Sequence, residues 1–282
     1  MIALAENTYG KSSVRLMKVK RDGPLHTVKE WKVEVLLAGD FESCFTAGDN
    51  SDILPTDTMK NTVYSRARES AAECIEDFAR ELTEFFLGRN PQVKSVAINI
   101  AGTAWENAVS QGKPYPSTFL RGTGETQTTT VTCSQGAAAC VTSGLDGLVV
   151  LKTANSGFEG YLRDSLTTLP ETADRLFGTS MRAQWTYQSA ALPFEQLRSK
   201  LRQTLIDAFA EHDSKSVQHT LYAMAQAALE AVPEIVDIEL AMPNKHCLLV
   251  DLSRFGQTNP NEIFVPVDEP YGNITARITR EG

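Results

Sequence analysis

The chain has 282 residues, of which 42% are hydrophobic and 22% are charged, and it carries a formal net charge of −8. A chain of this length forms one large domain or two domains of about 140 residues each. The acidic balance argues against nonspecific binding to nucleic acid or to anionic membranes, because both need a basic surface.

The first half of the chain begins with strand patterns. A strand is expected at residues 14–20, and a second follows, in which the alternating residues Trp31, Val33, Val35 and Leu37 face one side. Residues 41–46 are expected to supply a hairpin partner. A helix with an apolar stripe from Ile75 to Phe86 then ends at Gly88. The next strands are predicted at residues 93–100 and 126–133.

The second half repeats this order of elements. Strands are predicted at residues 148–153 and 182–188, helices at 193–212 and 216–232, and strands at 235–252, 262–267 and 273–279. Strands followed by helices and again by strands imply an α+β fold, with helices on one face of a largely antiparallel sheet. We therefore expect two units, residues 1–140 and 141–282.

Several classes of protein find no support in the sequence. No apolar run approaches the roughly 20 residues of a membrane span, and neither a secretory signal nor a peroxisomal Ser-Lys-Leu tail is present, so a cytoplasmic protein is expected.

The five cysteines include no Cys-x-x-Cys pair. Metalloprotease, dinucleotide and phosphate-loop motifs are also missing, so no metal or nucleotide cofactor is expected, although a metal site built from distant residues stays open. His212 and His219 are expected to be solvated surface residues.

Asn244 and His246 stand out because they interrupt an apolar run. In a strand, side chains two residues apart point to the same face, while Lys245 points to the other. A half-buried amide and imidazole cost free energy unless they are hydrogen-bonded. The pair therefore either anchors local structure or handles a ligand, and on these residues alone the structural interpretation comes first.

Other polar segments occur where a strand or helix pattern changes. Each has an ordinary structural explanation, such as a solvated lysine, a helix cap or a surface ion pair. Together with the Asn244 segment, however, they resemble the urate oxidase (uricase) family. The matching segments are Tyr9-Gly-Lys11, Asp49-Asn-Ser51, Thr56-Asp-Thr-Met-Lys-Asn-Thr62, Leu151-Lys-Thr-Ala-Asn-Ser156, Leu162-Arg-Asp164, Ser216-Val-Gln218, Pro243-Asn-Lys-His246 and residues 262–272, in family order over nearly the whole chain.

The resemblance implies a fold and an assembly. Each chain would hold two tandem tunnelling-fold (T-fold) units, each a four-stranded antiparallel sheet with two helices. Two chains would close their sheets into an intersubunit β-barrel, and two barrels would stack into a homotetramer with active sites at subunit interfaces. The implied reaction is oxidation of urate by O2 to 5-hydroxyisourate and hydrogen peroxide, without metal or organic cofactor.

The resemblance also implies roles for single residues in substrate binding. Arg175 and Gln218 would clamp the purine, because guanidinium and amide groups match its carbonyl oxygens and anionic nitrogens. Phe158 would stack on the ring. The backbone N–H groups of Val217 and Thr56, both near predicted helix starts, would also meet it.

The implied chemistry needs a base and a site for oxygen. Lys11 would be the general base, and Thr56 and His246 would relay the proton. Asn244 with Thr56 would hold O2 and later water. Asp57 is counted with the substrate-binding residues and would orient the turn at Thr56.

Two departures from the family pattern, Pro55 in place of alanine and Tyr161 in place of phenylalanine, remove no polar catalytic group. The alternatives are a purine-binding or structural oligomer that has lost catalysis, and another T-fold enzyme acting on a pterin or purine nucleotide.

Overall fold

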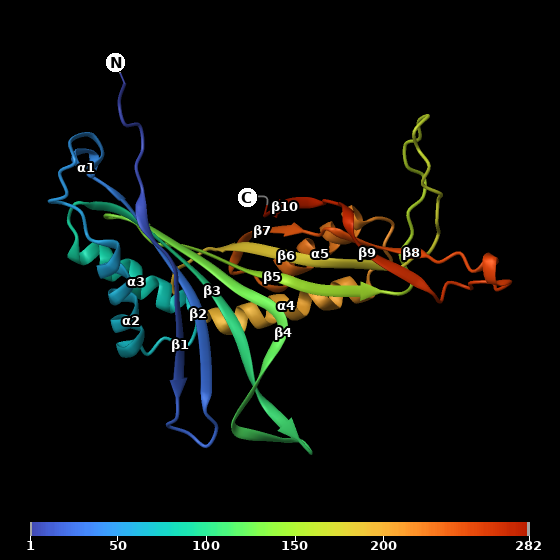
Figure 1. The fold of residues 1–282 in the computed structure, drawn as a ribbon, viewed down its shortest axis with the longest axis horizontal. Coiled ribbons are helices and arrows are strands. Elements are labelled where there is room, and N and C mark those ends of the chain that lie inside the picture. The colour runs from blue at the N-terminus through green and yellow to red at the C-terminus, as the bar shows by residue number, and fades with distance from the viewer. Residues whose placement is uncertain (1, 281–282) are drawn as a thin grey trace. The chain divides into compact units, whose positions relative to one another are not determined.

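The computed structural model describes residues 2–280, and the chain divides into two compact units (Figure 1). The first unit takes the residues up to Leu145 together with Trp185–Gln196. The second takes Asp146–Gln184 and the residues from Leu197 onward. The single boundary expected after residue 140 stays a prediction.

The first unit is built on four antiparallel strands in sequential order. They are β1 (Tyr9–Lys20), β2 (Thr27–Gly39), β3 (Val93–Ser110) and β4 (Lys113–Ser134). The apolar alternation predicted for β2 is confirmed, because Trp31, Val33, Val35 and Leu37 are all buried. The corresponding face of β3 buries Val96, Ile98 and Ile100, so one face of this sheet forms the core.

Helices cover that face. The helices of this unit are α1 (Glu42–Ala47), α2 (Thr56–Glu69) and α3 (Ile75–Arg89). The last of these contacts β3 and β4, and α2 contacts β1 (Figure 1). The ring of Trp31 on β2 stacks on Phe78 of α3, with centroids 5.1 Å apart. The predicted apolar stripe of α3 thus packs on the sheet, although the helix continues through Gly88 and ends one residue later.

The strand expected at residues 41–46 is wrong, because these residues form the short helix α1. Phe41 is fully buried and packs edge-on against Tyr9, with ring centroids 4.8 Å apart. Gly48 ends the helix in the left-handed conformation (φ 70°), and its N–H donates to the carbonyl of Ser43. A glycine in this position is a common helix terminator.

The remaining strands and two long helices lie mainly in the second unit, while the start of β5, the end of β6 and the start of α4 belong to the first. The elements are β5 (Cys140–Lys152), β6 (Phe177–Tyr187), α4 (Phe194–Glu211), α5 (Val217–Ala231), β7 (Ile235–Ala241), β8 (Asn244–Leu249), the 3-10 turn Ser253–Phe255, β9 (Phe264–Gly272) and β10 (Thr275–Thr279). Strands β5, β6, β7 and β10 follow one another in the sheet. Helix α5 packs on β7 and β10, and Phe209 of α4 contacts Phe177 of β6 at 5.2 Å.

The single strand expected over residues 235–252 is wrong, because it is broken at Met242 and Pro243. Proline has no N–H for a strand ladder and is found at strand edges and ends. Strand β7 pairs with β10, whereas β8 pairs with β6 and β9. This break moves Asn244 out of the line of β7 and onto a different strand.

No helix among the described residues has the length and apolar content that a membrane crossing requires.

Candidate active site

Lys11 lies on β1 beside a β-bulge. The pairing of β1 with β2 shifts register between Lys11 and Val14, and Ser13 takes a left-handed backbone conformation (φ 59°). At the preceding Gly10, a Cβ atom would lie 1.8 Å from the carbonyl oxygen of Val35. Because bulges re-aim neighbouring side chains, the bulge and the close approach at Gly10 together fix the position of Lys11.

Thr56 and Asp57 begin α2. The first N–H groups of a helix have no partner within the helix and lie at its positive end, so Thr56 offers an N–H suited to an anion. The carboxylate of Asp57 binds Lys60 and accepts a hydrogen bond of 3.0 Å from Asn61. The hydrogen bond from Lys60 lowers the pKa of Asp57 most, and the charge of Lys11 lowers it further. This geometry suits an orienting role for Asp57.

Tyr9 ties β1 to the segment before α2. The N–H of Leu54 donates to the Tyr9 hydroxyl at 2.9 Å, while burial raises the pKa of that hydroxyl. The contact holds the strand of Lys11 to the chain that leads into Thr56. In the sequence, Tyr9 stands out only as part of a segment that matches the family. The signal that could have identified Tyr9 is its position, because it places an aromatic hydroxyl two residues before the expected base.

Phe158 and Arg175 lie at the two ends of the loop between β5 and β6. Phe158 exchanges backbone hydrogen bonds of 2.8 and 3.2 Å with Thr172. The Arg175 guanidinium carbon lies 5.2 Å from the centre of the Phe158 ring. Burial lowers the pKa of Arg175, yet a guanidinium stays charged at neutral pH. An aromatic face and a planar cation are therefore held side by side, as a flat anion requires.

Tyr161 extends this aromatic group. Its ring stacks on Phe158 with centroids 4.8 Å apart and planes 14° apart, and the Arg163 guanidinium carbon lies 5.7 Å from its centre. In the sequence, Tyr161 stands out only as a departure from the family pattern. The stacking partner of Phe158 was therefore missed, because its three-residue spacing lies in a loop without periodicity.

The backbone around Phe158 is bound on both sides. Gly157 donates to the carbonyl of Ser214 at 2.8 Å, and Ser214 donates to the carbonyl of Asn155 at 3.0 Å. On the other side, Arg175 donates through its N–H to the carbonyl of Ser156 at 2.8 Å. These bonds tie the Phe158 segment both to the connection between α4 and α5 and to the chain that carries Arg175.

Gly157 leaves no space for a larger residue, since an added Cβ atom would lie 2.8 Å from the carbonyl oxygen of Ala173. We expect Gly157→Ala to lower the free energy of unfolding by about 1–3 kcal/mol, the usual cost of overpacking. Scanning calorimetry measures the change. The matched control is Gly88→Ala in α3, where nothing lies within 4 Å and alanine should stabilise the helix by up to about 1 kcal/mol. A Gly157→Ala variant that melts no lower than the native chain would contradict this account.

Asn244 and His246 line one cavity with Phe158 and Arg175. The cavity has a volume of about 510 Å³ and lies within the second unit. The amide nitrogen of Asn244 and Nδ1 of His246 are 3.5 Å apart, so the two side chains share one side, as the strand alternation predicted. The ammonium group of Lys245 instead binds Asp268 at 3.1 Å. The cavity thus collects an aromatic ring, a guanidinium, an amide and an imidazole.

Val217 and Gln218 form the start of α5. Ser216 caps the helix by accepting a hydrogen bond of 3.1 Å from the N–H of His219. Val217 is buried, and the side chain of Gln218 is exposed. The helix start therefore presents a first-turn N–H together with an accessible amide, which suits an anionic ligand with carbonyl oxygens.

The predicted site residues fall into two groups, one in each compact unit. Lys11, Thr56 and Asp57 belong to the first unit, and Phe158, Arg175, Val217, Gln218, Asn244 and His246 belong to the second. Over the described residues, no group of three or more His, Cys, Asp or Glu side chains is placed to hold a metal ion.

The fold and these groups define an α+β protein of two antiparallel-sheet units with polar groups suited to a flat anion. The family model for uricase matches residues 7–132 and 141–275. The chain is 40% identical to the uricase of Arthrobacter globiformis over 281 residues, covering 100% of this chain and 91% of that protein. It is 37% identical to the uricase of Dictyostelium discoideum over 283 residues, covering 99% and 98%.

Solved structures agree with these matches. The crystal structure of the uricase from Arthrobacter globiformis superposes with a TM-score of 0.95 at 39% identity, covering 100% of this chain and 96% of that one. A urate oxidase from Bacillus sp. TB-90 shares the fold with a TM-score of 0.85 at 21% identity, covering 98% and 100%. The chain belongs to the uricase family, and the resemblance and the α+β T-fold inferred from the sequence are confirmed.

Proposed function

We propose that this chain is a urate oxidase, which transfers two electrons from urate to O2 and yields 5-hydroxyisourate and hydrogen peroxide. One water is consumed, so that urate, O2 and water balance the two products. The observation that carries the proposal is the cavity of about 510 Å³ in which Phe158, Arg175, Asn244 and His246 meet, in a chain of the uricase family.

Substrate binding uses the groups of the second unit. Urate is a flat anion with several carbonyl oxygens, so Arg175 pairs with it through two parallel N–H donors, and Gln218 offers both a donor and an acceptor. The ring of Phe158 stacks on the purine, and the N–H of Val217 meets its edge. Burial of Arg175 strengthens the ion pair, because the attraction between charges rises as water is removed.

Proton transfer and oxygen binding use the remaining groups. Lys11 takes a proton from urate, with Thr56 and His246 as relays, and the amide of Asn244 with Thr56 holds O2 and then water above the ring. The closeness of the Asn244 amide and the His246 ring supports this division of roles, because a ligand at one group lies next to the other. Asp57 orients the turn from which Thr56 presents its N–H.

The assembly we propose is a homotetramer with active sites at subunit interfaces. In the described part of the chain, β2 is the only strand paired with β1, and β7 is the only strand paired with β10. Open strand edges invite pairing with another chain. Closure of a barrel between two copies would satisfy both edges.

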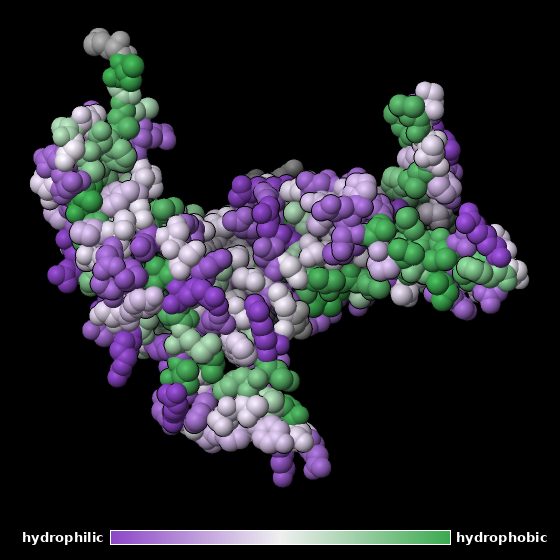
Figure 2. Space-filling model, in the orientation of Figure 1, coloured by the Kyte–Doolittle hydropathy of each residue, from purple (hydrophilic) through white to green (hydrophobic). Residues whose placement is uncertain are grey.

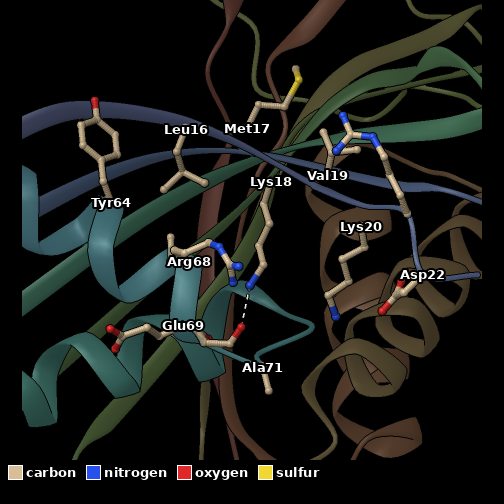
Figure 3. Close-up of a pocket in the computed structure, with 13 residues that line it drawn as sticks. Leu16, Met17, Lys18, Val19, Lys20, Asp22, Tyr64, Arg68, Glu69 and Ala71 are labelled. Carbon is tan, nitrogen blue, oxygen red and sulfur yellow. Dashed lines mark hydrogen bonds between the residues drawn. The ribbon is translucent and has the colours of Figure 1, made fainter.

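The surface beside the β1 edge is hollowed. Figure 3 shows side chains that line this hollow between β1 and the end of α2. The hollow has a volume of about 760 Å³, and its lining residues are 16–22, 64 and 67–71. Lys18 spans it and donates to the carbonyl of Ser70 at 2.6 Å (Figure 3). A second copy of the chain would cover this hollow.

Apolar side chains also reach the surface of the second unit, over β8 and β9 and on the loop between β5 and β6 (Figure 2). Leu162 and Leu166 are 94% and 85% exposed, and Leu248 on β8 is 56% exposed. Apolar side chains that gather on a protein surface mark contacts between proteins. It supports subunit contacts beyond the strand edges.

The activity is tested with metal-stripped protein and urate, by following urate absorbance, O2 uptake and peroxide release together. We expect equal consumption of urate and O2 with one peroxide formed per urate. Tight binding of urate without turnover would leave only a binding protein and end the proposal. Turnover that a chelator abolishes would contradict a reaction without metal.

The oligomeric state is tested separately by native mass spectrometry. We expect a mass of four chains. A stable monomer that still turns over urate would contradict active sites at subunit interfaces.

A further inference from the structure

Two histidines face each other where α4 leads into α5. Nε2 of His212 lies 3.1 Å from Nδ1 of His219, and the ring centroids are 4.3 Å apart. His219 is exposed, as the sequence analysis expected of both, whereas His212 is partly buried. Their contact was not foreseen, because a spacing of seven residues across a helix end does not fix a distance.

The surrounding hydrogen bonds assign the proton between the rings. The backbone N–H of Lys215 donates to Nδ1 of His219 at 3.4 Å, so that nitrogen carries a lone pair. Nε2 of His212 is therefore the donor and Nδ1 of His219 the acceptor. A proton on Nδ1 of His219 would remove the acceptor of both bonds.

Protonation of His212 is opposed by burial and by neighbouring positive charges. Burial lowers the pKa of His212 most, and the charges of His219, Lys152 and Lys215 lower it further, while Asp213 acts in the opposite direction. Lys152 of β5 donates to the carbonyl of His212. The negative charge of Asp213 is partly neutralised by its ion pair with Lys215 at 2.6 Å.

The pair lies at the short connection between α4 and α5. This connection contacts the Phe158 segment on one side and leads into Gln218 on the other. Ser214, within this connection, exchanges backbone hydrogen bonds with Asn155 and Gly157, next to Phe158. Ser216 caps α5 through the N–H of His219. Gln218, the proposed amide of the clamp, is the residue before His219. Movement of the pair therefore shifts the start of α5 relative to the Phe158 segment.

We propose that His212 and His219 form a neutral hydrogen-bonded pair that positions the first turn of α5 for urate, so that urate binding weakens as the pH falls. The inference rests on the proposed function, since the ligand of this helix start is urate. The two histidines are positioning residues, because neither is placed against the substrate.

The sign of the effect follows from the direction of the shift. His212 takes up a proton less readily in the folded chain than in the unfolded chain, so the unfolded state binds more protons as the pH falls. The pair therefore contributes fully above the ordinary histidine range near about pH 6.5, and this contribution is lost as the pH falls through the lowered pKa of His212 in the folded chain.

The test compares three variants across pH. His219→Gln keeps an acceptor that does not titrate, His219→Leu removes the acceptor, and His26→Gln is the matched control in the first unit. We expect the native KM for urate to rise about three- to tenfold between about pH 8 and pH 5.5 beyond any rise in His219→Gln, the effect of losing one hydrogen bond. His219→Leu should show the raised KM already at about pH 8, and His26→Gln should follow the native chain.

Hydrogen exchange of peptides covering residues 212–220 gives a readout that needs no catalysis. At low pH, exchange should be faster in the native chain than in His219→Gln at the same pH, and equal at high pH. Equal exchange at every pH, or a KM profile that His219→Gln leaves unchanged, would overturn the inference. Absence of urate turnover alongside the expected exchange would instead refute the proposed function and leave the pair in place.

Discussion

A Lys11→Met variant is expected to oxidise urate about 10²- to 10⁴-fold more slowly than the native chain, the range that general base catalysis contributes. Methionine keeps an unbranched stem of similar length, with sulfur in place of one methylene, and removes the ammonium group. The bulge after Lys11 and the close approach at Gly10 are backbone features, so the strand should keep its course. The loss should appear in kcat, because Lys11 is assigned to proton transfer rather than to the clamp on urate.

The matched control is Lys32→Met on β2, an exposed lysine with the same stem length, which should leave turnover near the native rate. Stopped-flow absorbance gives kcat for both variants, and native mass spectrometry checks that their assembly equals that of the native chain. Turnover of Lys11→Met within a few-fold of the native rate, with the assembly intact, would remove Lys11 from the base role.

Prediction of the fold from the sequence succeeded where apolar residues repeat with a clear period. The faces of β2, β3 and α3 were found in this way, because burial on one side leaves a period of two or of about 3.6 residues. The far end of the β3–β4 hairpin was missed. Its residues pair with each other across Gln111 and Gly112, both with positive φ (49° and 75°). They bury little apolar surface, so only the turn residues signalled the hairpin.

Prediction of the candidate site also succeeded only where residues repeat with a clear period. Alternation alone placed Asn244 and His246 on one side of a strand, and the 3.5 Å between their side chains agrees with it. Phe158 and Arg175, at opposite ends of one loop, were grouped only through the family resemblance, because no local period relates positions so far apart. The His212–His219 contact and the Tyr161 stack escaped for the same reason, since both arise where a helix end or a loop turns back.

Arg175→Gln is expected to lower kcat/KM for urate by about 30- to 5,000-fold, which corresponds to the roughly 2–5 kcal/mol lost when one partner of a buried charge pair is removed. Glutamine retains a planar donor near Phe158 and removes the positive charge. Arg175 is partly buried, so water would not fully replace the guanidinium beside an anionic purine. Arg175→Lys should recover only part of the loss, because an ammonium group lacks the planar pair of donors.

Arg163→Gln is the control, because Arg163 is an exposed arginine of the same loop that lies over Tyr161 and does not line the cavity. It should change kcat/KM by less than about threefold, as expected for a solvent-exposed charge. Calorimetric titration with xanthine, a purine that lacks the C8 oxygen and is not oxidised in this way, separates binding from turnover. If Arg175→Gln binds xanthine as tightly as the native chain while turnover falls, the guanidinium acts on the reaction and not on the ground-state complex. If both are unchanged, Arg175 is not part of the clamp, and the charge that holds urate must come from another residue.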